Sequence, residues 1–326
     1  MNRRVVAISL LILGVLPCVS HAQQPSKVWR VGMLETLSMA SNAANLDAFL
    51  QGMRDLGYVE GQNLVLDYRS AEGYAERFPN LANEMVRGNV DVIVTRGTPA
   101  TTAARAATAQ IPIVTAASSD MVSTGLAKSL RRPGGNVTGL DPFGSVLFSK
   151  RVELVREIFP NTTTILSVMN VANPVTALGW KEIERAARAM NIQASLFDAR
   201  RTEDLEGAFK EGVKLRANAL LIGQGPLTQA NSKNIVALAT KYRMPAVYVA
   251  GEYVDYGGLI SLGVRYPDLY RRAATYVDKI LKGAKAGDLP IEQATRFELV
   301  INLKTAKALD IAIPRTVLLR ADRVIE

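Results

Sequence analysis

Two short segments in the first half of the chain carry side chains suited to bind an anion. Residues 97–99 (Gly-Thr-Pro) follow the apolar segment 90–95, and residues 118–120 (Ser-Ser-Asp) follow the apolar segment 111–116. A Thr-Pro pair is typical of a helix start, because the hydroxyl of Thr98 can cap the first turn and proline suits the first helical position. The free N–H groups of such a start, together with the serine hydroxyls, can bind a carboxylate. The alternatives are that Thr98 only caps its helix and that the serines only form a turn.

Three acidic side chains lie at predicted strand ends, where open α/β sheets bind their ligands. Glu35 follows the predicted strand 29–34, Asp120 ends the serine segment, and Glu252 follows the predicted strand 246–249. Glu35 and Asp120 are candidates to bind an ammonium group, and the alternative is a carboxylate that is only solvated. The predicted ligand-binding residues are Glu35, Thr36, Gly97, Thr98, Ser118, Ser119, Asp120, Asn170, Gln224, Glu252 and Tyr253.

The candidates in the second half of the chain are mostly uncharged. Asn170 follows a predicted strand and could bind a polar ligand or cap a helix. Gln224 stands between two glycines, where a backbone can approach a ligand closely, although Gly225-Pro226 is equally typical of a plain turn. Tyr253 could stack on an aromatic ring.

The positions of cysteine and histidine exclude several kinds of catalysis. Cys18 and His21 are the single residues of their types, and both lie in the first 22 residues. If that segment is removed, thiol chemistry, Ser-His or Cys-His nucleophiles and ordinary zinc or copper sites are excluded. The sequence contains no nucleophile elbow, phosphate-binding loop or dinucleotide fingerprint. We therefore predict no catalytic residue, metal or cofactor. The alternative is an exported hydrolase in which Glu35, Asp120 and Glu252 supply the acid and the base.

Residues 1–22 are typical of a secretion signal. Arg3 and Arg4 precede the apolar segment 5–16, and small residues stand before a cleavage position after Ala22. A proline directly before the cysteine of this segment disfavours lipidation, so we expect a periplasmic protein without a lipid anchor. The net charge of +9 comes from scattered basic residues, which indicates a solvated surface rather than binding to nucleic acid.

Strand and helix patterns alternate along the chain and restart after residue 140. Single helices between apolar strands predict parallel sheets with right-handed crossovers, which is an α/β fold. The first lobe is predicted at 28–140 plus about 263–292, and the second at 141–262 plus about 293–326. We expect the chain to cross between the lobes near 140–142, 259–263 and 290–296, where three strands would form a hinge.

The predicted elements follow from the apolar spacing. The strands are expected at 29–34, 64–68, 90–95, 111–116, 137–140, 164–169, 193–198, 219–222, 246–249, 259–262 and 297–301. The helices are expected at 42–56, 78–87, 99–108, 121–130, 148–158, 175–190, 205–215, 229–242, 268–281 and 305–309.

An ordered set of short motifs carries a family resemblance. The motifs are Gly57–Asn63, Val90–Ala100, Ile111–Val114, Arg132–Leu140, Gly257–Leu259, Tyr270–Ala274 and Val300–Leu303. In them the chain resembles the solute-binding proteins of ABC importers, in the group that includes tryptophan- and aromatic-amino-acid-binding members. The resemblance implies a type I periplasmic-binding-protein fold, with two Rossmann-like lobes and a ligand enclosed in the cleft. Met121 and Leu262 stand where the family commonly has proline and tyrosine, which would affect the cleft wall and the hinge.

The sequence thus predicts the extracytoplasmic solute-binding component of an ABC importer, which traps a small polar solute between closing lobes. The solute is expected to be an amino acid or another small carboxylate, aromatic ones included. The expected partners are this solute and an ABC permease in the inner membrane, with no nucleic acid, and the protein is expected to be a monomer. A ligand-binding sensor for a membrane signalling partner would share the fold and the cleft, and it stays open as an alternative.

Overall fold

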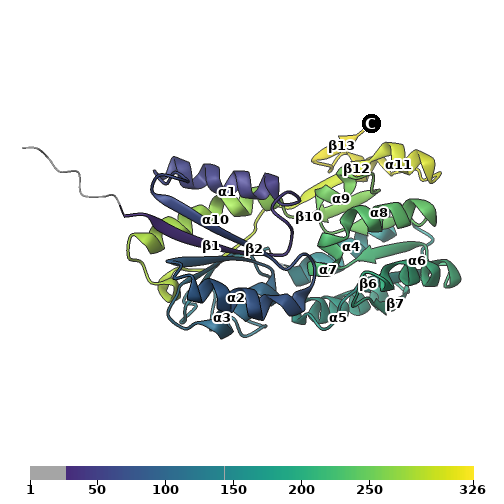
Figure 1. Ribbon diagram of the computed structural model, residues 1–326. Helices are drawn as coiled ribbons and strands as arrows, with labels where there is room; N and C mark the ends of the chain where they lie inside the picture. Colours follow the sequence, from purple (N-terminus) through teal and green to yellow (C-terminus); the bar gives the residue numbers. More distant parts are fainter. Residues whose placement is uncertain (1–26, 143) are drawn as a thin grey trace, which may run out of the picture.

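A computed structural model describes residues 27–142 and 144–326, and it shows two β-sheets with helices on both faces of each (Figure 1). We call each sheet with its helices a lobe; the first lobe contains β1 and the second contains β6. The predicted secretion signal at 1–22 lies outside the described residues. No helix within the described ranges combines the length and the apolar character needed to cross a membrane.

The first sheet has the strand order β11-β5-β4-β3-β1-β2, and its neighbouring strands are parallel. Every residue of β3 and β4 is buried, as expected for strands that are covered on both faces. The bounds are β1 (Trp29–Glu35), β2 (Leu64–Ser70), β3 (Val92–Arg96), β4 (Ile113–Ala117), β5 (Val137–Asp141) and β11 (Glu292–Gln293).

Four helices cover the first sheet. One face carries α1 (Ala43–Asp55) and α10 (Tyr266–Leu281), and the other carries α2 (Phe78–Arg87), preceded by the 3₁₀ turn η1 (Ala75–Arg77), and α3 (Thr98–Ala107). The helices α1 and α10 pack so closely that a Cβ atom at Gly52 would lie 2.8 Å from the Cβ of Ala274. Because α10 follows strands of the second sheet in the sequence, this contact returns the chain to the first lobe.

The second sheet has the strand order β13-β12-β10-β9-β8-β6-β7, and β12 is antiparallel to β10. Its strands are β6 (Thr164–Met169), β7 (Gln193–Asp198), β8 (Ala219–Ile222), β9 (Ala246–Tyr248), β10 (Ile260–Gly263), β12 (Glu298–Asn302) and β13 (Arg323–Ile325). One face packs on α4 (Gly144–Ile158), α5 (Pro174–Ala189), α11 (Leu303–Ala308) and α12 (Arg315–Leu318). The other packs on α6 (Asp204–Lys214), α7 (Pro226–Ala230), α8 (Ser232–Lys241) and α9 (Gly251–Asp255).

The chain passes between the lobes at three places. The passages join β5 to α4, β10 to α10, and β11 to β12. The first and third passages lie near the predicted crossings at 140–142 and 290–296, whereas the second lies after β10 rather than within 259–263. The α/β architecture of two mostly parallel sheets is confirmed.

The predicted helix at 121–130 is wrong. This segment forms a series of turns, because Asp120 and Gly125 both adopt positive φ angles, of 53° and 74°. A helix needs negative φ at successive residues, and Gly125 interrupts this condition in the middle of the segment. Met121 lies inside the core of the first lobe rather than on a cleft wall, fully buried.

The helix predicted at 229–242 is present as α8, but it begins later than predicted, because Asn231 separates α8 from α7. The side-chain amide of Asn231 donates a hydrogen bond of 2.9 Å to the backbone carbonyl of Leu227, within α7. The backbone N–H of Asn231 donates to the same carbonyl at 3.1 Å, so two donors of this residue share one acceptor where the helix is interrupted. The short elements α9, α12, β11 and β13 are additions that the sequence pattern did not predict.

Candidate functional site

A small pocket of about 20 Å³ lies between the lobes, and we call it the inner pocket. Its volume is close to the minimum of about 10–15 Å³ that holds one water molecule. The first lobe contributes Thr36, Gly97, Thr98, Pro99 and Ser119. The second lobe contributes Asn173, Val175, Gln224, Gly225, Pro226 and Gln229. Six of these side chains are neutral hydrogen-bonding groups, contributed by both lobes.

Two long helices begin at the inner pocket, one from each lobe. In the first lobe Gly97 has a φ of 86° and turns the chain from β3 into α3, which has proline in its first turn. In the second lobe the side chain of Asn173 caps α5 by accepting a hydrogen bond from the N–H of Val175 at 3.3 Å. The N-terminal ends of helices carry partial positive charge and favour anionic groups. The inner pocket is therefore suited to a carboxylate.

Hydroxyl groups complete the first-lobe side of the inner pocket. The hydroxyls of Thr98 and Ser118 share a hydrogen bond of 3.1 Å. The side chain of Ser119 is 2% exposed, and its Oγ has no hydrogen-bond partner among the described residues. A buried hydroxyl without a partner is energetically unfavourable, so Ser119 is available to donate to a ligand in this pocket.

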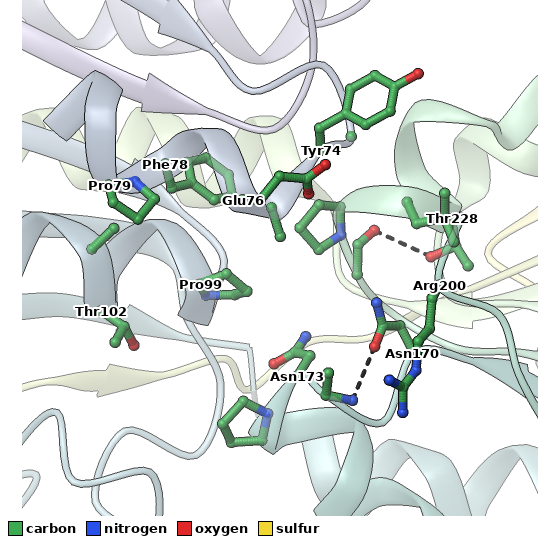
Figure 2. Close-up of a pocket in the computed structure, with 18 of the residues that line it drawn as sticks. Tyr74, Glu76, Phe78, Pro79, Pro99, Thr102, Asn170, Asn173, Arg200 and Thr228 are labelled. Atoms are coloured by element: carbon green, nitrogen blue, oxygen red, sulfur yellow. Dashed lines mark hydrogen bonds between the residues drawn. The ribbon is translucent and has the colours of Figure 1, made fainter. Parts of the chain in front are cut away.

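A larger cleft of about 840 Å³ lies beside the inner pocket, and we call it the outer cleft. The two spaces adjoin, because both are lined by Pro99, Asn173, Gln224, Gly225 and Pro226. Figure 2 shows Pro79, Pro99 and Thr102 of the first lobe facing Asn170, Asn173 and Arg200 of the second.

The two walls of the outer cleft differ in chemistry. On the first-lobe wall, proline and alanine side chains and Phe78 lie beside four polar residues, which are Tyr74, Glu76, Asn83 and Thr102. The second-lobe wall carries the larger share of the polar groups, including Asn170, Arg200 and Gln224. The carbonyl oxygen of the Asn170 side chain accepts the N–H of Ala172 at 2.9 Å, and Arg200 Nε donates to Asp198 at 2.8 Å. The polar wall is thus fixed by its own hydrogen bonds.

The lobes touch at Gly73, beside the outer cleft. A Cβ atom at Gly73 would lie 2.6 Å from the Cβ of Ala230 and 3.5 Å from the carbonyl oxygen of Pro226, both on α7 of the second lobe. Gly73 also has a φ of 89°, a backbone conformation that favours glycine. The two lobes therefore leave no room for a larger residue at this position.

Glu35 lies inside the first lobe, next to Arg96. Its side chain is fully buried and accepts a hydrogen bond of 2.7 Å from the hydroxyl of Tyr270. Burial raises the pKa of Glu35 to about 7, although Arg96 and the bond from Tyr270 act in the opposite direction. Its second oxygen has no hydrogen-bond partner among the described residues.

Arg96 links this interior to the second lobe. Its guanidinium donates to Asn42 at 3.0 Å and lies 4.1 Å from the centre of the Tyr266 ring. The hydroxyl of Tyr266 accepts a hydrogen bond of 3.3 Å from Gln229, which lines the inner pocket. Burial disfavours the charged form, but neighbours that include Tyr270 and Glu252 raise the pKa of Arg96 above its ordinary value. Arg96 therefore stays charged at the boundary between the lobes.

The predicted site residues fall into two groups. Thr36, Gly97, Thr98, Ser119 and Gln224 meet in the inner pocket, and Asn170 and Gln224 line the outer cleft. The remaining predicted residues, which are Glu35, Ser118, Asp120, Glu252 and Tyr253, lie outside the linings of both spaces.

Tyr253 lies inside the second lobe, where its hydroxyl donates to the carbonyl oxygen of Thr228 at 2.7 Å. Its ring stacks on that of Tyr248 with the centroids 4.9 Å apart. The hydroxyl of Ser118 forms a hydrogen bond with that of Thr98. The charge of Glu252, in α9, helps to raise the pKa of Arg96. Asp120 is half-buried and sits next to Ser119.

Several lining residues were missed in the sequence. Pro226 and Gln229 lie in α7, which begins at Pro226 in a segment that the sequence also allowed as a turn. Arg200 follows a strand, as do several of the predicted residues. The cleft-lining faces of α2 and α3 could not be identified from the sequence, because alanine-rich helix faces are equally typical of a buried core. Within the described residues, no group of three or more His, Cys, Asp and Glu side chains is placed to hold a metal ion.

Comparisons with known proteins agree with this geometry. The model of a family described as ABC transporter substrate binding protein matches residues 30–325. A tyrosine-binding protein of Clostridioides difficile (strain R20291) is 27% identical over 262 residues, which cover 80% of this chain and 75% of that protein.

Two solved structures are similar over the whole fold. A conserved domain protein from Vibrio cholerae is 30% identical with a TM-score of 0.86, covering 91% of this chain and 100% of that one. A domain from Streptococcus pneumonia in complex with L-Trp is 25% identical with a TM-score of 0.84, covering 92% of this chain and 100% of that one. The type I periplasmic-binding-protein fold is therefore confirmed.

Proposed function

Because the chain belongs to the family of ABC transporter substrate-binding proteins, we propose that it captures a small carboxylate outside the cytoplasm and delivers it to an importer. The lobes at 28–140 plus 263–292 and at 141–262 plus 293–326 rotate about the three passages and close on the solute. The partner in this function is an ABC permease in the inner membrane. The chain acts there as a periplasmic monomer, exported by the signal at 1–22.

The observation that carries this proposal is the composition of the inner pocket. The starts of α3 and α5 and the unpartnered hydroxyl of Ser119 meet there, from both lobes. A carboxylate placed between them would accept hydrogen bonds from both lobes at once. Binding would then favour the closed arrangement, because the ligand has more partners in it than in an open one.

The relatives indicate which carboxylates to test first. One is named as tyrosine-binding and another was solved in complex with L-Trp. We therefore take aromatic amino acids and related aromatic acids as the leading solutes. Glu35, Asp120, Glu252 and Tyr253 then support closure or the shape of the site, without direct contact to the solute in the closed arrangement.

The test combines a binding screen with a matched pair of variants. Tyrosine, tryptophan and their deaminated acids are screened by thermal shift and calorimetry, because a ligand of the folded state raises the melting temperature. Ser119→Ala should weaken the best ligand by about tenfold, the value of roughly one hydrogen bond to a charged group. Ser167→Ala is the control, since Ser167 is also buried with an unpartnered hydroxyl among the described residues but lies in β6, outside both linings.

Equal affinities of the two serine variants would refute the proposed carboxylate pocket. The bound solute should also be recovered chemically unchanged after long incubation, since the proposal assigns no catalysis to this site. Conversion of the solute would favour the hydrolase alternative instead.

A further inference from the structure

We infer that the second lobe carries a further binding site, separate from the cleft, for a small organic anion with an apolar body. The site is a pocket of about 310 Å³ between α8 and α11, and we call it the α8–α11 pocket (Figure 1). None of its lining residues belongs to the inner pocket or the outer cleft. The inference therefore goes beyond the proposed function and does not rest on it.

The walls of the α8–α11 pocket are largely apolar. Val236, Ala239 and Met244 line it from α8 and the loop that follows, and Ala308 and Leu309 line it from the end of α11. Its volume is at the lower end of the range of roughly 300–1,000 Å³ in which proteins bind small molecules. A ligand with a compact apolar body would gain free energy by displacing water from these walls.

A buried tyrosine supplies the pocket with a hydrogen-bonding group. Tyr248, the last residue of β9, lines the pocket and is 1% exposed. Its ring stacks on that of Tyr253 and lies against Gly258, where a Cβ atom would be 2.5 Å from Cε2 of the ring. The ring is thus held in place on two sides.

The hydroxyl of Tyr248 has no hydrogen-bond partner among the described residues. Burial raises the pKa of Tyr248, so this hydroxyl stays protonated and can donate a hydrogen bond. A buried hydroxyl without a partner is energetically unfavourable. A ligand in the pocket that offers an acceptor oxygen would remove this cost.

The charged residues in the lining of the α8–α11 pocket are Arg243 and Lys304, and both are basic. Lys304, on α11, is exposed and forms no ion pair among the described residues. Arg243 pairs at 3.4 Å with Asp310, and both side chains of this pair are exposed, so the pair contributes little. Positive charge at the edge, a free hydroxyl donor and apolar walls together favour an anion with an apolar body.

The experiment uses octanoate as the probe and octanamide as its uncharged analogue of the same length. Met244 lines the pocket, so the resonance of its isotopically labelled methyl group reports binding at this place in the full chain. Met244→Leu assigns this resonance. Octanoate should shift it and leave the methyl resonance of Met53, in α1 of the first lobe, unchanged. Octanamide should bind at least about fivefold more weakly, because hydrogen bonds to a charged acceptor are stronger.

Substitutions in the lining test each contribution separately. Tyr248→Phe removes only the hydroxyl and should weaken octanoate by about tenfold, the value of roughly one hydrogen bond to a charged group. Ala308→Phe, at an exposed position of the wall, should weaken it at least as much by filling the pocket. Lys304→Gln should weaken it by about two- to threefold. Lys307→Gln is the matched control, since Lys307 is also an exposed lysine of α11 but lies outside the lining.

Melting temperatures without ligand establish that each variant is folded. Weaker binding of octanoate in Tyr248→Phe and Ala308→Phe, with the affinity of Lys307→Gln unchanged, supports the inference. It is overturned if octanoate does not shift the Met244 resonance, or if Tyr248→Phe and Ala308→Phe bind octanoate as tightly as the natural protein does. Equal affinities for octanoate and octanamide would also overturn it, because the pocket would then not select an anion.

Discussion

Side chains at the carboxyl ends of parallel strands are used differently in the two lobes. In the first lobe, Glu35 at the end of β1 and Arg96 at the end of β3 turn into the interior and are almost fully buried. In the second lobe, Asn170 after β6 and Gln224 after β8 line the outer cleft. The charged side chains at these strand ends are thus buried in the first lobe, whereas the amide side chains after the strands of the second lobe line the cleft.

This difference explains the two walls of the cleft. With its strand-end charges turned inward, the first lobe presents helix faces, and α3 offers small apolar side chains. The second lobe presents loops with amides and an arginine. In the outer cleft, most of the polar groups therefore belong to the second lobe, whereas the first lobe supplies hydroxyl groups to the inner pocket.

The burial of Glu35 in the first lobe leads to the prediction with the largest expected effect, which concerns the pH dependence of the free energy of unfolding. Its pKa rises from 4.5 to about 7 on folding, so the folded protein keeps a proton that the unfolded chain loses between these values. The stability of the natural protein should therefore fall as the pH rises from about 4.5 to 7 and level off above 7, by about 3 kcal/mol from this residue. Glu35→Gln lacks this titration.

Urea unfolding of the natural protein and of Glu35→Gln across pH 4.5 to 8 measures this contribution. The difference between the two free energies of unfolding should change by about 3 kcal/mol over this range, in favour of the variant at high pH. Parallel pH profiles would show that Glu35 is not held in a desolvated interior, and the contrast between the lobes would be lost.

The contact between the walls at Gly73 gives the next largest effect. Gly73→Ala places a methyl group 2.6 Å from the Cβ of Ala230, which the closed arrangement cannot accept without moving the lobes apart. Overpacking of this kind costs about 1–3 kcal/mol, so the affinity for the best solute should fall by roughly 10- to 100-fold. Small-angle scattering with the solute should show incomplete compaction.

Gly57→Ala is the matched control for this change. Gly57 has a φ of 90°, almost the same as Gly73, but a Cβ there would meet nothing within 4 Å. Both variants carry a similar backbone strain in the folded state. Gly57→Ala adds no steric contact, so it should not affect the closure of the two lobes on the solute. If both variants bind the solute equally well, the contact at Gly73 does not limit closure.

The local chemistry of the chain predicts part of the site. Thr98 and Ser119 are found because the Thr-Pro helix start and the apolar strands before it are encoded within a few residues. The alternation of strands and helices likewise predicts the two sheets and their three connections, since each crossover is local.

The orientation of the strand-end side chains is not encoded locally. Glu35 turns inward to meet Tyr270, which lies 235 residues further along the chain. Arg96 ends an apolar strand, and its partners Asn42 and Tyr266 come from two distant helix starts. Only the packed structure determines whether such a side chain faces the core or the cleft.

Substitution of Gln224 tests whether the polar wall binds the solute, and its expected effect on affinity lies between those of Gly73→Ala and Arg200→Ala. It lines both the inner pocket and the outer cleft, so Gln224→Ala should weaken the best solute by about tenfold through loss of hydrogen bonds at the bound state. Gln193→Ala, at an exposed position on β7 outside the linings, should leave affinity unchanged. Calorimetry of both variants decides whether the second lobe contributes polar contacts to binding.

Arg200 at the rim of the same wall should matter least. Its side chain is 65% exposed and pairs with Asp198, and exposed pairs of this kind contribute about 0–1 kcal/mol. Arg200→Ala should therefore change the affinity by no more than about twofold, with little dependence on salt. A loss of tenfold or more that disappears at high salt would mean that the solute carries a second anionic group at the rim. The second lobe would then select solutes by charge, and not by neutral hydrogen-bonding groups alone.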